Sequence, residues 1–415
     1  MWDQGKADLR VPRKTELRRT QRTLCMVVHG PYPLDPRVVR EARVALGQGY
    51  EVDVVATRQP GEPAEEYVEG VRVIRLPVAH TMGGGAGRII SEYAAFSLLA
   101  SACLVRLALD RRYAIVHVHN PPDFLVAAAL IPRLIGCRVI FDIHDLSPDM
   151  FNMRFEGRRG ADVADRLLKG LERWATRIAD GVITVHDGYA RELVRRGVPA
   201  EKLTVVMNSV DEHRLPPPVR TSNRGFRVVY HGTVTPQYGL ELVVEAVARV
   251  SCRVPEIQLD VYGTGDAVAA ARDRSAALGV ADRVHFTDRY LPHAEVLDRV
   301  RSADVGVIPN LPTQLNRFAL SSKLFEYVAL GVPVVSSDLP TIREHFADDE
   351  LRFFRAGDSD ALAEALFDVA SNATAARARA QKALQRYEAY RWPRNAARYA
   401  QLLNRVTSQT RRRNV

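Results

Sequence analysis

The stretch Ser321-Ser322-Lys323-Leu324-Phe325-Glu326-Tyr327-Val328-Ala329-Leu330-Gly331-Val332-Pro333 decides the fold, because it predicts a short helix between two buried strands. Serine at the start and Gly331 with Pro333 at the end are typical helix boundaries. Apolar runs at residues 304–309 and 332–336 flank the helix. This order of strand, loop, helix and strand indicates a parallel α/β sheet.

The predicted helix carries a cation and a carboxylate on one face. Lys323 and Glu326 are three residues apart, which makes them neighbours on a helix surface. Free N–H groups at a helix start and an ammonium group suit phosphate oxygens, and a carboxylate one turn later suits a ribose diol. The same spacing fits an ordinary surface ion pair, so this segment alone leaves both interpretations open.

The length of 415 residues predicts two domains with ample core. The four cysteines are far apart, and the sequence has no C-x-x-C motif and no clustered histidines. We therefore expect no metal site and a reduced, cytoplasmic setting. Residues 1–22 lack the apolar core of a secretory signal, and no later segment is expected to reach membrane-spanning length.

The formal net charge of +9 is concentrated at the two ends of the chain. Residues 1–22 carry seven Lys/Arg against three Asp/Glu, and residues 401–415 carry four Arg and no acid. The body is therefore nearly neutral, which argues against a nucleic-acid partner. The basic ends fit either solvated tails or peripheral contact with an anionic membrane, such as the inner face of the cell membrane.

Short apolar runs alternate with helical patterns, which predicts two doubly wound parallel sheets in Rossmann-like domains that face each other across a cleft. The expected strands are residues 24–29, 51–56, 115–119, 138–143, 181–185 and 203–207 in the first sheet, and 226–230, 258–262, 283–286, 304–308 and 332–335 in the second. The predicted order is a basic tail (1–22), a first domain (23–212), a proline-containing linker (213–225), a second domain (226–386), a helix that packs back on the first domain (387–406) and a basic tail (407–415).

Residues 88–110 are expected to form a long helix after a flexible glycine-rich loop at 82–87. The uncharged part of this helix, residues 93–105, is too short to span a bilayer. A core helix is therefore favoured over one that dips into a membrane interface.

Six segments carry a further signal through their order and spacing. They are Asp35-Pro36-Arg37-Val38-Val39-Arg40-Glu41-Ala42, His117-Val118-His119-Asn120-Pro121-Pro122-Asp123, Phe141-Asp142-Ile143-His144-Asp145, Tyr230-His231-Gly232-Thr233, Val261-Tyr262-Gly263-Thr264-Gly265 and the Lys323/Glu326 helix. Together they resemble the family 4 retaining glycosyltransferases of the GT-B fold over roughly residues 24–405.

The resemblance implies transfer of a sugar from a nucleotide-diphosphate sugar to a saccharide or lipid-linked acceptor, in envelope polysaccharide or glycoconjugate synthesis. It implies that Glu326 holds the ribose, that Lys323 faces the diphosphate and that His144 contacts the transferring sugar, so His144 and Lys323 are the catalytic candidates. The donor is expected on Gly232, Thr233, Gly263, Arg289, Ser321 and Ser322 together with Lys323 and Glu326, and the acceptor against Gly30, Asp35, Arg37, His119 and Asp145.

Two departures from the family pattern matter for the chemistry. Phe318 replaces a second glutamate that usually holds the donor sugar, and the loop at 232–239 lacks the Arg and Lys that many members carry. Lys323 and the N–H groups after Gly232 and near Ser321 would then neutralise most of the leaving diphosphate. Because no acidic pair is spaced for a divalent ion near these loops, we expect metal-independent transfer without a cofactor.

Two other functions stay open. A sugar-nucleotide epimerase or phosphorylase could use the same fold, and a non-catalytic GT-B protein that binds a nucleotide or a partner would explain Phe318 and Thr233. Nucleotide release that depends on an acceptor would distinguish a transferase from a binding protein.

Overall fold

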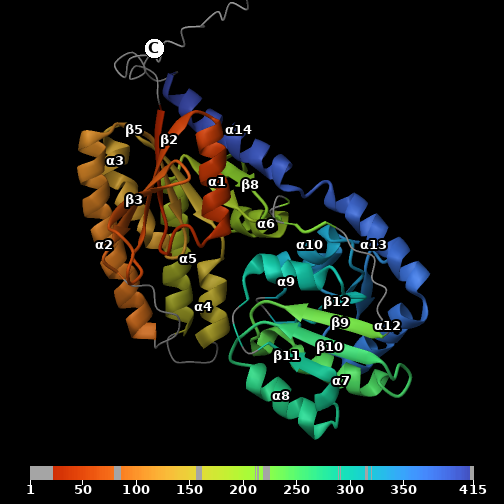
Figure 1. The fold of residues 1–415 in the computed structure, drawn as a ribbon. Helices are drawn as coiled ribbons and strands as arrows, with labels where there is room; N and C mark the ends of the chain where they lie inside the picture. The colour runs from red at the N-terminus through yellow and green to blue at the C-terminus, as the bar shows by residue number, and fades with distance from the viewer. Residues whose placement is uncertain are drawn as a thin grey trace, which may run out of the picture.

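Two α/β domains make up the computed structural model of the protein (Figure 1). The structure describes residues 22–78, 86–155, 161–210, 212, 215–217, 225–287, 289, 291–313, 316–318 and 320–411. Residues 1–21 of the predicted basic tail, the glycine-rich residues 82–85 and most of the predicted linker lie outside the described residues.

The first domain is built on an eight-stranded sheet with the order β3-β4-β2-β1-β5-β6-β7-β8. Neighbouring strands are parallel except β3 and β4, which are antiparallel. The strands are β1 (Arg22–Val27), β2 (Tyr50–Thr57), β3 (Glu65–Val68), β4 (Val71–Leu76), β5 (Tyr113–His119), β6 (Arg138–Ile143), β7 (Gly181–Thr184) and β8 (Leu203–Val205). The sequence pattern does not predict β3 and β4, because neither is a continuous apolar run. Half of the edge strand β3 is charged, and Arg72 and Arg75 interrupt its neighbour β4.

Helices cover both faces of the first sheet. They are α1 (Pro36–Gly47), α2 (Ala86–Asp110), η2 (Asp123–Ala129), α3 (Leu130–Leu134), α4 (Ser147–Phe155), α5 (Ala161–Ile178), α6 (Asp187–Arg195) and η3 (Ala200–Lys202). One core cluster joins the sheet to α2, η2, α5 and α6, and the other joins it to α1 and to the last helix of the chain. The nearly continuous apolar strands are therefore buried from both sides.

The second domain is built on a six-stranded parallel sheet with the order β11-β10-β9-β12-β13-β14. Its strands are β9 (Phe226–His231), β10 (Ile257–Tyr262), β11 (Val284–Phe286), β12 (Val305–Ile308), β13 (Val334–Ser337) and β14 (Arg352–Phe354). Its helices are η5 (Pro236–Tyr238), α7 (Leu240–Val250), α8 (Val268–Ala277), η6 (Ala281–Arg283), α9 (His293–Val300), α10 (Ser322–Ala329), α11 (Pro340–Arg343), α12 (Ser359–Ser371) and α13 (Ala373–Tyr387). The sequence pattern also leaves out β14, which has only three residues.

Helix α10 lies unusually close to the second sheet. A Cβ at Gly306 on β12 would come within 2.6 Å of the ring of Tyr327 on α10. Only a residue without a side chain lets the ring lie flat against the strand at this point. The buried face of α10, which includes Leu324, Phe325 and Val328, is thereby fixed, and its other face is directed to the strand ends.

The last helix, α14 (Trp392–Arg411), runs back from the second domain and packs on α1 and β8 of the first domain (Figure 1). The sequence predicts one helix over 387–406, whereas the chain turns at 388–391 and α14 begins at Trp392. Pro393 then sits in the first turn, where proline removes no helical hydrogen bond. Helix α14 continues to Arg411, so part of the predicted tail is helical.

Helix α2 corrects one expectation of the sequence analysis. By length and composition Gly87–Asp110 is long and apolar enough to cross a membrane, and about a third of its apolar window is buried within the protein. One side of the helix, with Phe96 and Leu104, packs in the core, while Leu98 and Leu109 on the opposite side are 73% and 77% exposed. Helix α2 is therefore a half-buried surface helix with an apolar outer face.

Candidate active site

Helix α10 presents its first turn to the end of strand β9. Ser321 occupies the N-cap position with extended backbone, but its side chain makes no capping hydrogen bond, in contrast to the predicted serine cap. Ser322 is exposed and Lys323 is half-buried. Gly331, with φ of +71°, follows the helix in a left-handed conformation that glycine adopts without strain.

Lys323 reaches across to the loop that follows β9. Its Nζ donates to the Tyr230 hydroxyl at 3.0 Å and to the Thr233 carbonyl at 3.3 Å. The ammonium also lies 4.4 Å and 4.8 Å from the ring centres of Tyr230 and Tyr238, which stabilises its charge. Burial lowers the pKa of Lys323 to about 7, although the nearby Glu326 opposes this shift. Of the two interpretations that the sequence leaves open, the structure therefore does not support an ordinary surface ion pair, because the ammonium is held against a glycine loop.

That loop is shaped by backbone contacts that allow no side chain. Gly232 has φ of +92°, and a Cβ there would come within 2.5 Å of Lys323 Cε. A Cβ at Gly263, after β10, would come within 1.9 Å of the Gly232 carbonyl oxygen. The two loops therefore pack backbone to backbone at the carboxyl ends of β9 and β10, the edge where doubly wound sheets bind ligands.

Glu326 lies beside Lys323 on α10 and is held by two histidines. His293 Nε2 is 3.1 Å from Glu326 Oε1, and His231 Nε2 is 3.2 Å from Oε2. Burial alone would raise the pKa of Glu326, but the hydrogen bond from His293 and the charges of His231, His293 and Lys323 outweigh it and hold the pKa below its usual range. Glu326 is thus a buried carboxylate with lone pairs left for a further donor.

A cavity of about 220 Å³ opens between the β9 and β10 loops and α9. Its wall is formed by Gly232, Thr233, Gly263, Arg289 and Leu291, together with His231, Tyr262, Thr264, His293 and Val296. Arg289 is exposed, and its guanidinium nitrogen lies 3.5 Å from the Glu295 carboxylate. Arg289, a predicted donor residue, therefore lies at this wall beside Leu291, while residues 288 and 290 lie outside the described residues.

On the first domain, Asp35 and Arg37 hold each other at the start of α1. Asp35 Oδ1 accepts from the Arg37 backbone N–H at 2.9 Å and from Arg37 Nε at 3.0 Å, and Oδ2 accepts from a guanidinium nitrogen at 2.8 Å. Burial opposes ionisation, but the hydrogen bonds and charge of Arg37 hold the pKa of Asp35 well below its usual range. The Gly30 carbonyl accepts from the Thr57 N–H at 3.1 Å.

His119 and His144 meet in the interior of the first domain. His119 Nδ1 lies 3.2 Å from His144 Nε2, and Asp142 Oδ2 lies 3.2 Å and 3.3 Å from these two nitrogens. His144 is only 5% exposed, and burial lowers its pKa to about 3, with a further contribution from the charge of Arg37. In this structure the His144 imidazole faces a buried polar cluster, whereas the family resemblance implies an open contact with the sugar.

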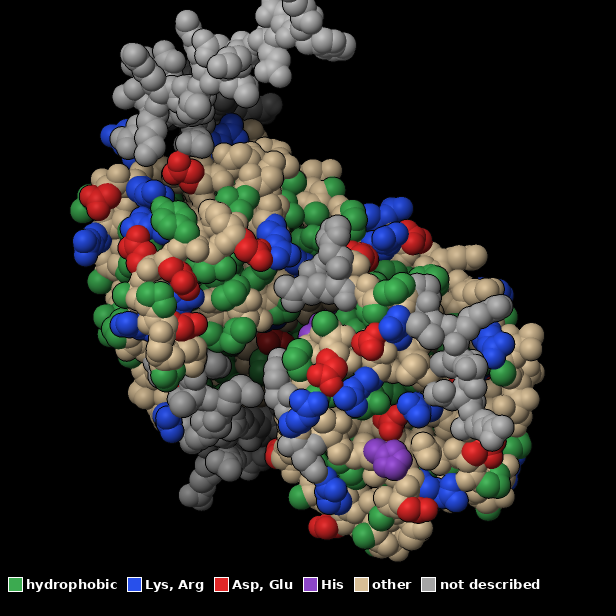
Figure 2. All heavy atoms as spheres, viewed as in Figure 1, with side chains coloured by type: hydrophobic (Ala, Val, Ile, Leu, Met, Phe, Trp, Pro, Cys, Tyr) green, Lys and Arg blue, Asp and Glu red, His purple; other side chains and the backbone are tan. Residues whose placement is uncertain are grey.

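Asp145 follows this cluster and faces the second domain. Burial raises the pKa of Tyr238, and the charge of Asp145 raises it further. Asp145 therefore lies across the cleft from the loop at 232–239, which holds Lys323. The hollow between the two lobes is visible in Figure 2. The residues predicted to face the acceptor, here called the acceptor edge, therefore lie across the cleft from the residues predicted to bind the donor.

Phe318 has a different role from the glutamate that it replaces. Its ring packs against the core cluster of the first domain that includes Tyr189 and Leu193, and the Arg317 guanidinium lies 5.6 Å from its ring centre. Phe318 is therefore a contact between the domains.

Four residues of the site are not predicted from the sequence, namely Tyr238, His293, Glu41 and Asp142. Asp142 has a recognisable signal, since it lies near the end of β6, two residues before His144, which directly follows the strand. Glu41, Tyr238 and His293 come from elements distant in sequence and have no local signal. The histidine cluster at 117, 119 and 144 also differs from the expectation that no histidines cluster.

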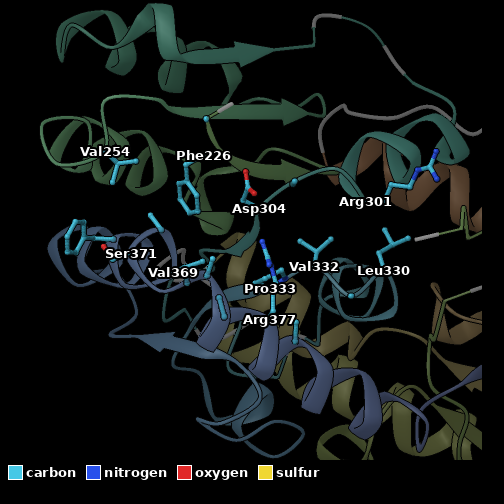
Figure 3. Close-up of a pocket in the computed structure, with 18 of the residues that line it drawn as sticks. Phe226, Val254, Arg301, Asp304, Leu330, Val332, Pro333, Val369, Ser371 and Arg377 are labelled. Carbon is cyan, nitrogen blue, oxygen red and sulfur yellow. The ribbon is translucent and has the colours of Figure 1, made fainter. Parts of the chain in front are cut away.

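A larger cavity, of about 1060 Å³, lies at the opposite end of the second sheet (Figure 3). It is lined by Phe226, Asp304 and Pro333, which lie at the amino ends of β9, β12 and β13, and by Arg377 of α13. Parallel sheets bind their ligands at the carboxyl ends of strands. This cavity is therefore separate from the candidate active site.

Two family models match the chain. The model described as Glycosyl transferase 4-like domain matches residues 36–209, and the model described as Glycosyl transferases group 1 matches residues 225–372. The matches correspond to the two sheets and to the two edges of the cleft. The protein is therefore a glycosyltransferase of the GT-B fold, whose first domain matches the 4-like model and whose second domain matches the group 1 model.

Individual relatives agree with this class. A phosphatidyl-myo-inositol mannosyltransferase of Mycobacterium leprae is 26% identical over 349 residues, which cover 82% of this chain and 84% of that protein. Sucrose-phosphate synthase from Thermosynechococcus elongatus has a TM-score of 0.75 at 18% identity, covering 94% of this chain and 100% of that one. HepE of Anabaena in complex with UDP has a TM-score of 0.67 at 15% identity, covering 92% and 100%. The two solved structures share the GT-B fold with this chain.

Proposed function

We propose that the protein is a retaining glycosyltransferase that moves a sugar from a nucleotide-diphosphate sugar to a saccharide or lipid-linked acceptor. The observation that carries this proposal is the position of the Lys323 ammonium beside the Gly232 loop, with Glu326 one turn further along α10. Glu326 contacts His231 and His293, which line the 220 Å³ cavity. This arrangement fits a diphosphate at Lys323, a ribose at Glu326 and a base toward Arg289 and Leu291.

The chemistry requires stabilisation of the leaving diphosphate. Negative charge grows on the phosphates as the glycosidic bond breaks, and preorganised donors stabilise it best when they are already in place. Lys323 is such a donor, because its Nζ is held by Tyr230 and the Thr233 carbonyl. We propose that the acceptor attacks the same face that the diphosphate leaves, with a departing phosphate oxygen taking the acceptor proton, and that no divalent ion is needed at the phosphates.

A screen of nucleotide sugars tests the donor site. UDP-, GDP- and ADP-sugars, including those of mannose and glucose, should be compared for the shift in melting temperature of the full chain, since a bound donor stabilises the fold by mass action. Glu326→Gln is expected to weaken binding of the best donor by about 10- to 100-fold, because a buried charged acceptor for the ribose is lost. Isothermal titration with the same donor measures this change.

The matched control for that variant is Glu364→Gln, which removes an exposed carboxylate that pairs with Arg253 on the far side of the domain. It should bind the donor like the wild type. A Glu326→Gln chain that melts normally and binds the donor with unchanged affinity would contradict the ribose assignment.

The second candidate function is a non-catalytic GT-B protein that binds a nucleotide. It is favoured by Phe318, which packs against the first domain in place of a donor-holding glutamate. The two functions differ in turnover. A transferase releases nucleotide from the bound donor in the presence of acceptor and gives a product with the anomeric configuration of the donor, which NMR of the product determines.

We further propose that the acceptor is lipid-linked and is reached from a membrane surface. Helices α2 and α3 are in contact and lie at one side of the first domain (Figure 1). Both carry exposed large apolar side chains, namely Ile90, Leu98 and Leu109 on α2 and Ile131 and Leu134 on α3. Leu98 and Leu109 are eleven residues apart and share one side of α2. Exposed apolar groups of this kind mark interaction surfaces.

The double variant Leu98→Glu/Leu134→Glu is expected to reduce binding to anionic phospholipid vesicles by at least about tenfold, because two carboxylates replace apolar contacts with the bilayer. Vesicle flotation measures the bound fraction. Tyr67→Glu, at an exposed residue on the edge strand β3, is the matched control and should float like the wild type. Equal flotation of the double variant would contradict the membrane proposal and leave the transferase proposal standing.

A further inference from the structure

A buried cluster of metal-ligand side chains lies beneath the acceptor edge. His117 and His119 are two residues apart on β5 and so point to the same side of the strand. Asp142 is the register partner of His119 on β6. Glu41 joins them from α1. The exposed fraction of each of the four residues is between 0% and 3%.

The ligand atoms of these four residues converge on one point. Glu41 Oε2, one nitrogen each of His117 and His119, and an Asp142 oxygen all lie within 4.8 Å of one another. His119 Nδ1 is 3.2 Å from Asp142 Oδ2 and 3.9 Å from Glu41 Oε2. His117 Nε2 is 3.7 Å and 4.0 Å from the same two oxygens.

Several of these atoms have no hydrogen-bond partner although they are buried. They include Glu41 Oε2, His117 Nε2 and both carboxylate oxygens of Asp142. Leaving one such group unsatisfied costs about 1–3 kcal/mol, and more when the group is charged. Three of these atoms, Glu41 Oε2, His117 Nε2 and Asp142 Oδ2, converge on one point and therefore indicate a missing common partner.

The orientation of His117 supports the same conclusion. Its Nδ1 lies 3.0 Å from the hydroxyl of Tyr399, which comes from α14. A metal-bound histidine usually fixes its other ring nitrogen by such a bond, because the bond sets the tautomer and aims the free nitrogen at the ion. Here the free nitrogen is Nε2, the atom that faces Asp142 and Glu41.

We propose that Glu41, His117, His119 and Asp142 bind one divalent transition-metal ion, and that this ion is Zn²⁺. Zinc takes imidazole and carboxylate ligands at about 2.0–2.2 Å in a tetrahedron, which places ligand atoms about 3.3–3.6 Å apart. The four separations between a histidine nitrogen and a carboxylate oxygen run from 3.2 to 4.0 Å, and all four ligand atoms lie within 4.8 Å of one another, close to this range. Four protein ligands leave no open position, which is typical of a structural site.

The ion would stabilise the arrangement of helices and strands beneath the residues predicted to face the acceptor. It would join α1, β5 and β6 and, through His117 and Tyr399, would tie down α14 as well. It would also fix Asp142 and His119, the two residues that contact the His144 imidazole. This inference goes beyond the proposed transfer function and is independent of it, since the ion would not touch the donor phosphates.

Metal content of the full chain tests the site. Protein purified without a metal-binding tag is expected to contain about one zinc per chain by inductively coupled plasma mass spectrometry, and His117→Gln and Asp142→Asn are expected to contain at least tenfold less. Cobalt exchanged into the wild type should give the strong visible absorption of tetrahedral Co²⁺. His345→Gln is the matched control, because His345 is also buried but contacts the Thr341 carbonyl in the second domain, at 2.8 Å from its Nδ1.

A measurement on the wild type alone covers the case in which the variants do not fold. A strong chelator is expected to lower the melting temperature, and stoichiometric Zn²⁺ is expected to restore it. Less than about a tenth of an equivalent of zinc, with no change in melting temperature on adding chelator or Zn²⁺, would overturn the proposal. The cluster would then be a network of shared protons.

Discussion

Lys323→Ala is expected to lower the rate of nucleotide release from the best donor by about 10²- to 10³-fold. A single preorganised donor that meets the charge of the transition state contributes on this scale, and loop 232–239 brings no cation of its own. The ground-state affinity should change less than the turnover, because the charge on the leaving phosphates is greatest as the bond breaks. Single-turnover kinetics with the donor found in the thermal screen measures both quantities.

Lys382→Ala is the control for this variant. Lys382 pairs with Asp349 on an exposed surface of the second domain, so its loss should leave turnover unchanged. A Lys323→Ala chain with normal turnover would refute the role of the ammonium, even if the donor still bound.

The position of Lys323 also gives the site a pH dependence. Because burial lowers the pKa of Lys323 to about 7, the free protein loses this charge as the pH rises above 7. The affinity for a nucleotide sugar, whose phosphates stay ionised throughout, is therefore expected to fall about tenfold between pH 7 and pH 8.5. Lys323→Ala should show a flat profile over the same range.

Gly263→Ala is expected to destabilise the second domain by about 2–4 kcal/mol, which corresponds to a melting temperature lower by about 5–12 °C. The new Cβ would come within 1.9 Å of the Gly232 carbonyl oxygen, and both partners are backbone atoms that cannot rotate away. The Gly232 loop must move, and the Thr233 carbonyl that holds Lys323 would move with it. Donor affinity should therefore fall as well. Calorimetry and donor titration measure the two effects.

Gly170→Ala is the matched control for this substitution. Gly170 lies inside helix α5, where a Cβ meets nothing within 4 Å. Alanine there should stabilise the chain slightly, because it favours the helix more than glycine does. Equal stability of Gly263→Ala and the wild type would show that the two loops do not need their close approach.

Much of the architecture follows from local patterns. Continuous apolar runs predict the central strands of both sheets, because strands that are buried on both faces have no polar side. The same rule does not predict β3 and β4, since half of β3 is charged and Arg72 and Arg75 interrupt the apolar residues of β4. At the end of the chain the sequence predicts the helix but not where it begins. The residues before and after 388–391 both have a helical pattern, so the break between α13 and α14 has no clear signal.

The candidate site divides in the same way. The sequence by itself determined that Lys323 and Glu326 share one face of a short helix, because residues three apart on a helix are neighbours whatever surrounds them. Only the tertiary structure decided what those side chains meet, because Tyr230 is 93 residues away from Lys323 and His293 is 33 residues away from Glu326.

The buried cluster under the acceptor edge depends still more on the fold. The pairs His117/His119 and Asp142/His144 can each be placed on one side of a strand from their spacing of two. Their convergence with Glu41 and Tyr399 requires β5 and β6 to pair in one register, and α1 and α14 to cover the same face. Local spacing fixes direction along one element, whereas distance between elements is set by packing of the whole core.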